Sequence, residues 1–152
     1  MSYLTQKTVK SNISFDGIAL HSGLDVKVCI KPAEPNFGIV FKRVDLKTNN
    51  LVFPNFMNVT NTSLNTTVEN EFGVKVSTIE HLMGALFGLG IDNALIEIDN
   101  EEVPIIDGSA KEFIKKIIAT GVRVTETPIK IIKIKKEIEY LEGERSISIK
   151  PS

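Results

Sequence analysis

Up to residue 76, the apolar residues mostly follow the alternating pattern that is typical of β-strands. Residues 25–30 alternate cleanly and end just before Pro32, which predicts a half-buried strand. We expect turns at Asp16-Gly17 and Ser22-Gly23, because glycine tolerates positive φ. Four other stretches before residue 77 favour strands, and so does one after it: 6–14, 38–43, 63–69, 74–76 and 94–98.

The period then changes to that of a helix. Apolar residues are spaced i, i+3, i+4 and i+7, which places them on one helical face: Ile79, Leu82, Met83 and Leu86. Ser77 and Glu80 form an S-x-x-E capping box at the expected start, and Gly88 is a plausible stop.

A second amphipathic helix is expected over residues 109–120, closed by Gly121. Its apolar stripe would consist of Ala110, Phe113, Ile114, Ile117 and Ile118. Asp107 or Ser109 could cap this helix. The alternative is that its N-terminus binds an anion.

The last part of the chain differs from the rest. Residues 129–140 largely alternate, residues 142–144 form a turn, and residues 146–150 alternate again, so we expect a hairpin. Residues 125–128 read as a linker. A lone hairpin is marginal in water, so this one is expected to join a larger sheet.

These patterns predict an α+β domain over residues 1–125, with two amphipathic helices packed on one face of a sheet. Residues 126–152 would be a linker and the opening hairpin of a second domain.

The chain has 152 residues, 42% hydrophobic residues and a net charge of −1, values that fit a folded core and give no overall electrostatic field that would attract nucleic acid. No apolar run approaches the roughly 20 residues of a membrane span.

The cysteine count and the N-terminus suggest a compartment. Cys29 is the only cysteine, which excludes an internal disulfide and a cysteine-rich zinc module. Such cysteine poverty suits a reducing cytoplasm. The first residues contain no apolar segment of a secretory signal. We therefore expect a cytoplasmic protein.

Candidate chemistry centres on the two histidines, His21 and His81. His81 follows Glu80 at the start of the first helix. Such a pair can divide two tasks, since the imidazole can bind a metal and the carboxylate can take a proton from metal-bound water. The alternative is that Glu80 serves only in the capping box and that His81 is an ordinary helix residue. Catalytic zinc usually takes three protein ligands, and sequence alone does not bring a third one to this pair.

Four stretches, in this order, carry a family resemblance: Gly17-Ile-Ala-Leu-His-Ser-Gly23, Val76-Ser-Thr-Ile-Glu-His-Leu82, Gly88-Leu-Gly-Ile-Asp-Asn93 and Glu102-Val-Pro-Ile-Ile-Asp-Gly-Ser-Ala110. Together they resemble the UDP-3-O-acyl-N-acetylglucosamine deacetylases, zinc amidases that commit bacteria to lipid A synthesis. The likeness covers nearly the whole chain. It implies two similar halves, each a sheet with two helices, with the helices of both halves packed between the sheets.

The resemblance also implies roles for individual residues. His81 would be a zinc ligand, and Glu80 would be the general base that activates zinc-bound water toward the acetamide carbonyl. Leu64 occupies the matching leucine of an active-site strand, so Leu64 and its neighbours Ser63 and Asn65 are expected to bind substrate. His21, in a matching glycine-flanked loop, is a further substrate-binding candidate.

In the family, a second half supplies the other two zinc ligands, in a His-x-x-x-Asp element, and a catalytic histidine. This sequence ends before that element. We therefore expect this chain to be the first half of a zinc deacetylase. Until the missing half joins it, the chain is expected to be inactive and to bind zinc weakly or not at all. The expected partners are acylated UDP-N-acetylglucosamine, that second half, and a second copy docked through the helix layer as a homodimer. The alternative is a non-catalytic module of the same fold that binds a nucleotide-sugar lipid or a protein partner.

Overall fold

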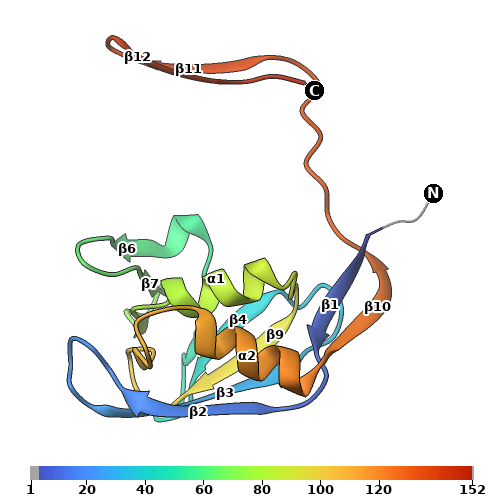
Figure 1. Ribbon diagram of the computed structural model, residues 1–152. Helices are drawn as coiled ribbons and strands as arrows, with labels where there is room; N and C mark the ends of the chain where they lie inside the picture. The colour runs from blue at the N-terminus through green and yellow to red at the C-terminus, as the bar shows by residue number, and fades with distance from the viewer. Residues whose placement is uncertain (1–3, 152) are drawn as a thin grey trace.

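The computed structural model describes residues 4–151. A five-stranded sheet in the order β2-β3-β9-β4-β5 forms one layer, and two helices cover one of its faces (Figure 1). The strands of this sheet are β2 (Ile13–Ile18), β3 (Asp25–Pro32), β4 (Ile39–Arg43), β5 (Leu51–Val52) and β9 (Ala94–Ile98), and the helices are α1 (Glu80–Gly88) and α2 (Lys111–Thr120). The α+β class and the helix layer on one face are therefore confirmed.

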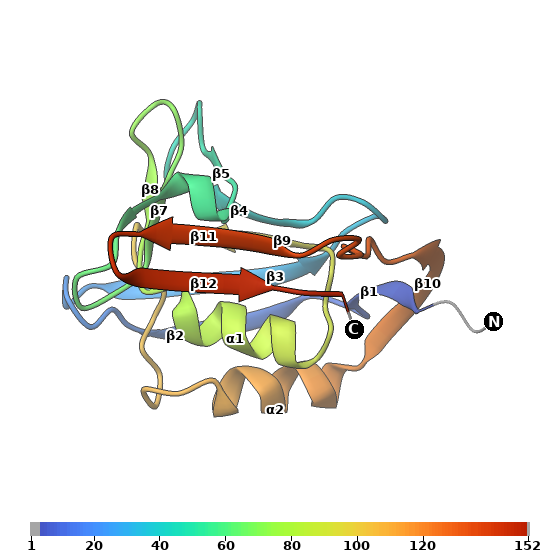
Figure 2. The ribbon, with the colours of Figure 1, turned by 90° about the horizontal axis from the view of Figure 1, so that it is seen from above.

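Three smaller sheets surround this body. In the first, β1 (Thr5–Val9) pairs antiparallel with β10 (Val122–Pro128). In the second, the short strands β6 (Val59–Asn61), β7 (Thr67–Glu69) and β8 (Lys75–Val76) follow the 3₁₀ turn η1 (Phe56–Asn58). The third is the hairpin of β11 (Ile138–Glu142) and β12 (Arg145–Ile149), which stands apart on the helix side of the molecule in Figure 1. Seen from above in Figure 2, it crosses over the body of the molecule.

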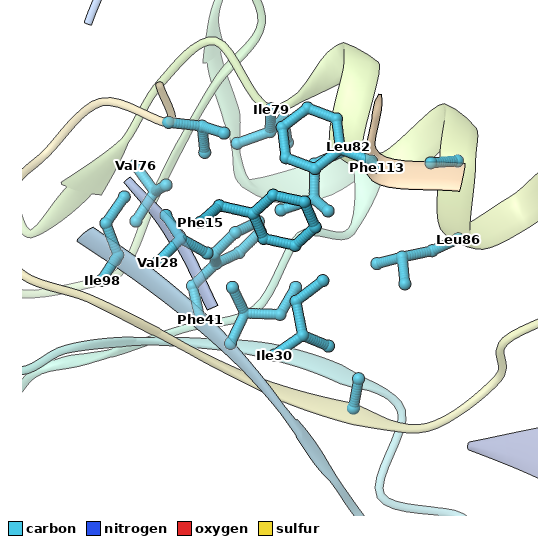
Figure 3. Packing of buried hydrophobic residues seen from close by; sticks show 14 of the residues in the cluster. Phe15, Val28, Ile30, Phe41, Val76, Ile79, Leu82, Leu86, Ile98 and Phe113 are labelled. Carbon is cyan, nitrogen blue, oxygen red and sulfur yellow. The ribbon is translucent and has the colours of Figure 1, made fainter. Parts of the chain in front are cut away.

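The core lies between the main sheet and the two helices. Alternate residues of β3 point inward and are buried, while Lys27 between them is exposed. Phe15 of β2 meets Phe113 of α2 with ring centroids 4.8 Å apart, which ties the sheet to the helix layer (Figure 3). Burial of a large aliphatic or aromatic side chain stabilises the fold by about 1.5–3 kcal/mol. The largest fully buried side chains include Phe15, Phe41, Phe113, Ile30, Leu82 and Leu86.

Both predicted helices exist, but some of their details differ from the prediction. The capping box is wrong: Ile79 occupies the N-cap of α1, and the Ser77 hydroxyl donates instead to the Glu101 carbonyl at 3.1 Å. In α2, Ile118 is 62% exposed, because the buried stripe is narrow and centres on Phe113 and Ile117. Ala110, and neither Asp107 nor Ser109, occupies the N-cap of α2, although the Ser109 hydroxyl accepts a hydrogen bond from the Lys111 N–H at 3.1 Å.

Several strand boundaries also differ. The single strand expected over 6–14 is two strands in different sheets, β1 and β2. The turn expected at Asp16-Gly17 is wrong, because both residues pair with β3 inside β2. A Cβ at Gly17 would lie 3.1 Å from side-chain atoms of Pro104 and Ile106, so glycine here permits a close approach rather than a turn.

The chain after α2 was predicted least accurately. Residues 125–128 are part of β10, paired with β1, and are not a linker. Of the alternating stretch 129–140, only Ile138 onward is strand. Similarly, strand structure in 63–69 begins only at Thr67. The division into domains at residue 125 stays a prediction.

Candidate active site at the start of α1

Glu80 is the first residue of α1 and binds the loop over residues 62–66. Its Oε2 accepts a hydrogen bond from the backbone N–H of Thr66 at 3.0 Å. The carbonyl of Thr66 in turn accepts from the N–H of Ile79 at 3.4 Å. The structure thus brings together two predicted parts of the site, the Glu-His pair and the loop that carries Leu64, through a contact between residues 14 positions apart.

The residues of this loop have different environments. Leu64 adopts a positive φ of 67° and its side chain is 88% exposed. Ser63 is exposed, and its N–H donates to the side-chain oxygen of Asn61. Asn65 is half-buried and accepts a hydrogen bond from the Thr67 hydroxyl at 2.9 Å. The hydrogen bonds of Asn61 and Asn65 therefore hold this loop, which contacts the start of α1 and presents the apolar side chain of Leu64 to solvent.

His81 is half-buried at the second position of α1. An imidazole there can serve as one metal ligand. Within residues 4–151, no three His, Cys, Asp or Glu side chains are grouped so that they could hold a metal ion. A catalytic zinc ion takes three protein ligands. In the described part of the chain, His81 is thus a candidate ligand with no two others grouped beside it.

His21 lies in the loop between β2 and β3, where its side chain is exposed. Its backbone N–H donates to Oε1 of Glu102 at 2.9 Å, and the N–H of Ser22 donates to Oε2 at the same distance. The hydroxyl of Thr78, two residues before Glu80, donates to Oε1 at 3.0 Å. Glu102 thus connects the His21 loop to the turn that begins α1.

The sequence interpretation assigned Glu102 no role. It is only 2% exposed although its neighbour Glu101 is exposed. The one sequence signal that distinguishes the two carboxylates is that Glu102, and not Glu101, lies in a stretch that carries the family resemblance. Burial opposes the charge on Glu102, but hydrogen bonds from the N–H groups of His21 and Ser22 and from the Thr78 hydroxyl outweigh it, so the pKa of Glu102 lies below its usual value. The carboxylate is therefore ionised at neutral pH.

A polar hollow of about 430 Å³ lies beside the same loop, and it contains one predicted site residue, Asn65. Its lining consists of Thr60, Asn61, Asn65, Thr67, Glu69, Lys75, Ser77 and Glu101. Another hollow of about 450 Å³, at the β5 edge, includes none of the predicted site residues and is lined by Asn49, Asn50, Leu51, Phe53, Asn58, Asn70, Glu71 and Phe72.

Comparison with known proteins places this site in a family. The family described as LpxC: UDP-3-O-acyl N-acetylglycosamine deacetylase matches residues 6–152. The chain belongs to this deacetylase family. The match includes the start of α1, the loop over 62–66 and Glu102, and it confirms the resemblance seen in the sequence.

Individual relatives agree with the family match. The chain is 41% identical over 148 residues, 97% of its length, to the UDP-3-O-acyl-N-acetylglucosamine deacetylase of Pseudoalteromonas atlantica, and covers 49% of that protein. The deacetylase of Citrifermentans bemidjiense is 44% identical over 147 residues, with 97% of the chain and 48% of the relative covered. That of Nautilia profundicola is 43% identical over 149 residues, with 98% and 50% covered. The chain thus spans about half the length of the curated relatives it matches.

Neither helix in the described part is long and apolar enough to cross a membrane.

Proposed function

We propose that this chain is the first half of a zinc-dependent deacetylase that hydrolyses the acetamide of acylated UDP-N-acetylglucosamine in lipid A synthesis. The observation that carries the proposal is the contact between Glu80 and Thr66, which holds a carboxylate against the loop that carries the exposed Leu64, in a chain of this family. The relatives that it matches are named for this deacetylation.

Glu80 is the proposed general base. Its bond to Thr66 uses Oε2, which leaves Oε1 to accept a proton from the water that attacks the acetamide carbonyl. A positioned base of this kind contributes about 10²–10⁴-fold to a rate. The hydrogen bond from Thr66 also fixes the carboxylate orientation, so that the base is held at the start of the helix.

His81 is proposed as one zinc ligand. The other ligands would come from outside the described residues, which do not provide a set of three. Zinc in the complete enzyme would supply Lewis-acid chemistry. We therefore propose that the isolated chain binds zinc weakly or not at all and is inactive by itself.

The substrate contacts are proposed at the loop and at His21. Leu64 would give an apolar contact, and Ser63 and Asn65 would give polar contacts, beside Glu80. His21 would contact the substrate from the β2–β3 loop, which Glu102 ties to the start of α1.

The helix layer is proposed as the surface for the partner. Phe87 of α1 is 88% exposed and Ile118 of α2 is 62% exposed, and large exposed apolar side chains favour association. In the complete enzyme, the second half would cover this layer, and in the isolated chain a second copy would substitute for it. We place residues 1–125 and the remainder of β10 in the first domain, the residues after β10 at the opening of the second, and the protein in the cytoplasm.

The test joins this chain to the second half of the Nautilia profundicola relative in one polypeptide, loads it with zinc, and measures deacetylation of acylated UDP-N-acetylglucosamine. Glu80→Gln removes the proton acceptor and is expected to lower the rate by roughly 10²–10⁴-fold. Glu112→Gln, at the corresponding first turn of α2, is the matched control and should leave the rate unchanged. Near-normal turnover by folded, zinc-loaded Glu80→Gln would return Glu80 to a structural role. No turnover by the folded, zinc-loaded fusion with Glu80 in place would favour the non-catalytic module.

A further inference from the structure

Glu102 joins three segments that meet beside the candidate site. We propose that Glu102 is a positioning residue, which holds the His21 loop and the start of α1 in one fixed arrangement so that His21 faces the same site as Glu80 and His81. The proposal deepens the proposed function and rests on it for the importance of that arrangement. Glu102 itself would touch neither substrate nor metal.

The hydrogen bonds need both oxygens of a carboxylate. Oε1 accepts from the His21 N–H and from the Thr78 hydroxyl, and Oε2 accepts from the Ser22 N–H. His21 is 81 residues and Thr78 is 24 residues from Glu102 in the chain, so no local structure substitutes for these contacts. In a glutamine, one of the two oxygens is replaced by an NH₂ group, which cannot accept a hydrogen bond. Whichever way the amide is turned, the NH₂ group would face a hydrogen-bond donor that now binds Glu102.

The backbone at Thr78 shows why the start of α1 needs such support. Thr78 has a φ of +55°, an unfavourable conformation for a β-branched residue. Strain of this kind persists only where surrounding contacts hold it, and it is common at functional sites. Thr78 is 3% exposed, and its hydroxyl is bound by Glu102. The strained residue, two positions before Glu80, sets where the helix begins.

Backbone pairing brings Glu102 to this point. The N–H of Ser77 donates to the Glu101 carbonyl at 2.8 Å, and the N–H of Val103 donates to the Ser77 carbonyl at 3.0 Å. Ser77 and Glu102 thus form a parallel bridge. The bridge aligns the two segments, and the Glu102 side chain then reaches past Thr78 to the His21 loop.

The experiment uses this chain and NMR, because its two histidines give two separate sets of imidazole signals. In Glu102→Gln, the amide protons of His21 and Ser22 are expected to exchange with solvent roughly 10- to 100-fold faster, the size expected for loss of a hydrogen bond to a charged group. The imidazole signals of His21 and His81 should both move. Glu101→Gln, the same change at the exposed neighbour, should leave exchange rates and imidazole signals as they are in the unaltered chain.

A second pair of variants decides the matter if Glu102→Gln does not fold. Thr78→Ser keeps the hydroxyl and should preserve both imidazole signals, whereas Thr78→Val keeps the shape, loses the hydroxyl and should move them. Unchanged exchange at His21 and Ser22 in folded Glu102→Gln, or equal spectra for the two Thr78 variants, would overturn the proposal. A change confined to His21 would also overturn it, because the link to α1 would be missing. These readouts need neither zinc nor substrate, so their outcome is independent of the activity test of Glu80.

Discussion

The carboxylate of Glu80 accepts a hydrogen bond from the backbone N–H of Thr66, with 3.0 Å between N and Oε2. This hydrogen bond attaches the loop over residues 62–66 to the first residue of α1. The same carboxylate therefore has a structural contact and a proposed catalytic task. The two can be separated, because the contact needs only an acceptor oxygen whereas the task needs a group that takes up a proton.

The first prediction concerns the stability of Glu80 variants. Glu80→Ala leaves the Thr66 N–H without its partner and is expected to lower the free energy of unfolding by about 1 kcal/mol. Glu80→Gln keeps an acceptor and should stay within about 0.5 kcal/mol of the unaltered chain. Urea denaturation measures both. Glu112→Ala, which removes an exposed ion pair with Lys115, is the control and should cost about 0.3–0.5 kcal/mol. Equal losses for the two Glu80 variants would argue against the contact.

The second prediction concerns zinc. His81 is the single zinc ligand that we propose within this chain, so metal analysis after dialysis should find far less than one zinc ion per chain. His81→Ala should remove most of any residual binding, and His21→Ala should not. Tight, stoichiometric zinc that survives dialysis would contradict this expectation, and its loss in His21→Ala would identify His21 as a second ligand.

The third prediction follows from the lowered pKa of Glu102. An unfolded glutamate titrates near 4.5, and the folded-state pKa lies below it. Below pH 4.5 the unfolded chain therefore binds more protons than the folded chain, and the stability from ionised Glu102 is lost as the pH falls through its folded pKa. The difference in Tm between the unaltered chain and Glu102→Gln should be greatest at neutral pH and should shrink progressively below pH 4.5. Asp45, whose pKa is also lowered, is present in both chains and cancels in this difference. A difference in Tm that grows as the pH falls would contradict a lowered pKa for Glu102.

The fourth prediction tests the close approach at Gly17. Gly17→Ala would place a Cβ 3.1 Å from side-chain atoms of Pro104 and Ile106, so it should destabilise the chain by about 1–3 kcal/mol. Gly84→Ala in α1 meets nothing within 4 Å and should stabilise the chain by about 0.4–1 kcal/mol. Thermal denaturation should therefore show a lower Tm for Gly17→Ala and a higher Tm for Gly84→Ala than for the unaltered chain. A neutral Gly17→Ala would mean that residues 104–106 move away freely.

The fifth prediction concerns association through the helix layer. Sedimentation of the isolated chain should show a homodimer, because Phe87 and Ile118 are exposed on that layer. Phe87→Asp should shift the equilibrium toward monomer. Phe56→Asp, at an equally exposed phenylalanine in η1 outside the helices, should not. A chain that stays monomeric at high concentration without aggregation would refute the dimer.

Local pattern predicted the elements that local energetics decide. The i, i+3, i+4 spacing located both helices, and Gly88 and Gly121 marked their ends, because these signals act within one or two turns. The capping box failed because Ser77 is held extended by its bridge to Glu102, so the chain cannot enter the helix until Thr78 has turned. A tertiary contact therefore overrode a valid local signal.

Pairing between distant segments was beyond local pattern. Residues 125–128 are polar and looked like a linker, but they gain a strand partner in β1. At the site, the family resemblance pointed to Glu80, His81 and Leu64, and the structure brought Glu80 and the Leu64 loop together. Glu102 was not found, because a buried carboxylate is recognised only by its donors, and those lie 24 to 81 residues away in the chain.

The pairing of β1 with β10 also sets an order of events during synthesis. Gln6 and Thr125, which are hydrogen-bonded across this pair, are 119 residues apart. At 5–20 residues per second, a ribosome needs roughly 6 to 24 s to make the chain between them. Throughout that time β1 lacks the partner of its ladder and can pair only at the Thr8–Asn93 bridge, although Val9 and Thr8 are completely buried in the finished fold. The first strand to be made is thus among the last to be paired, because both helices precede β10 in the chain and are synthesised before it.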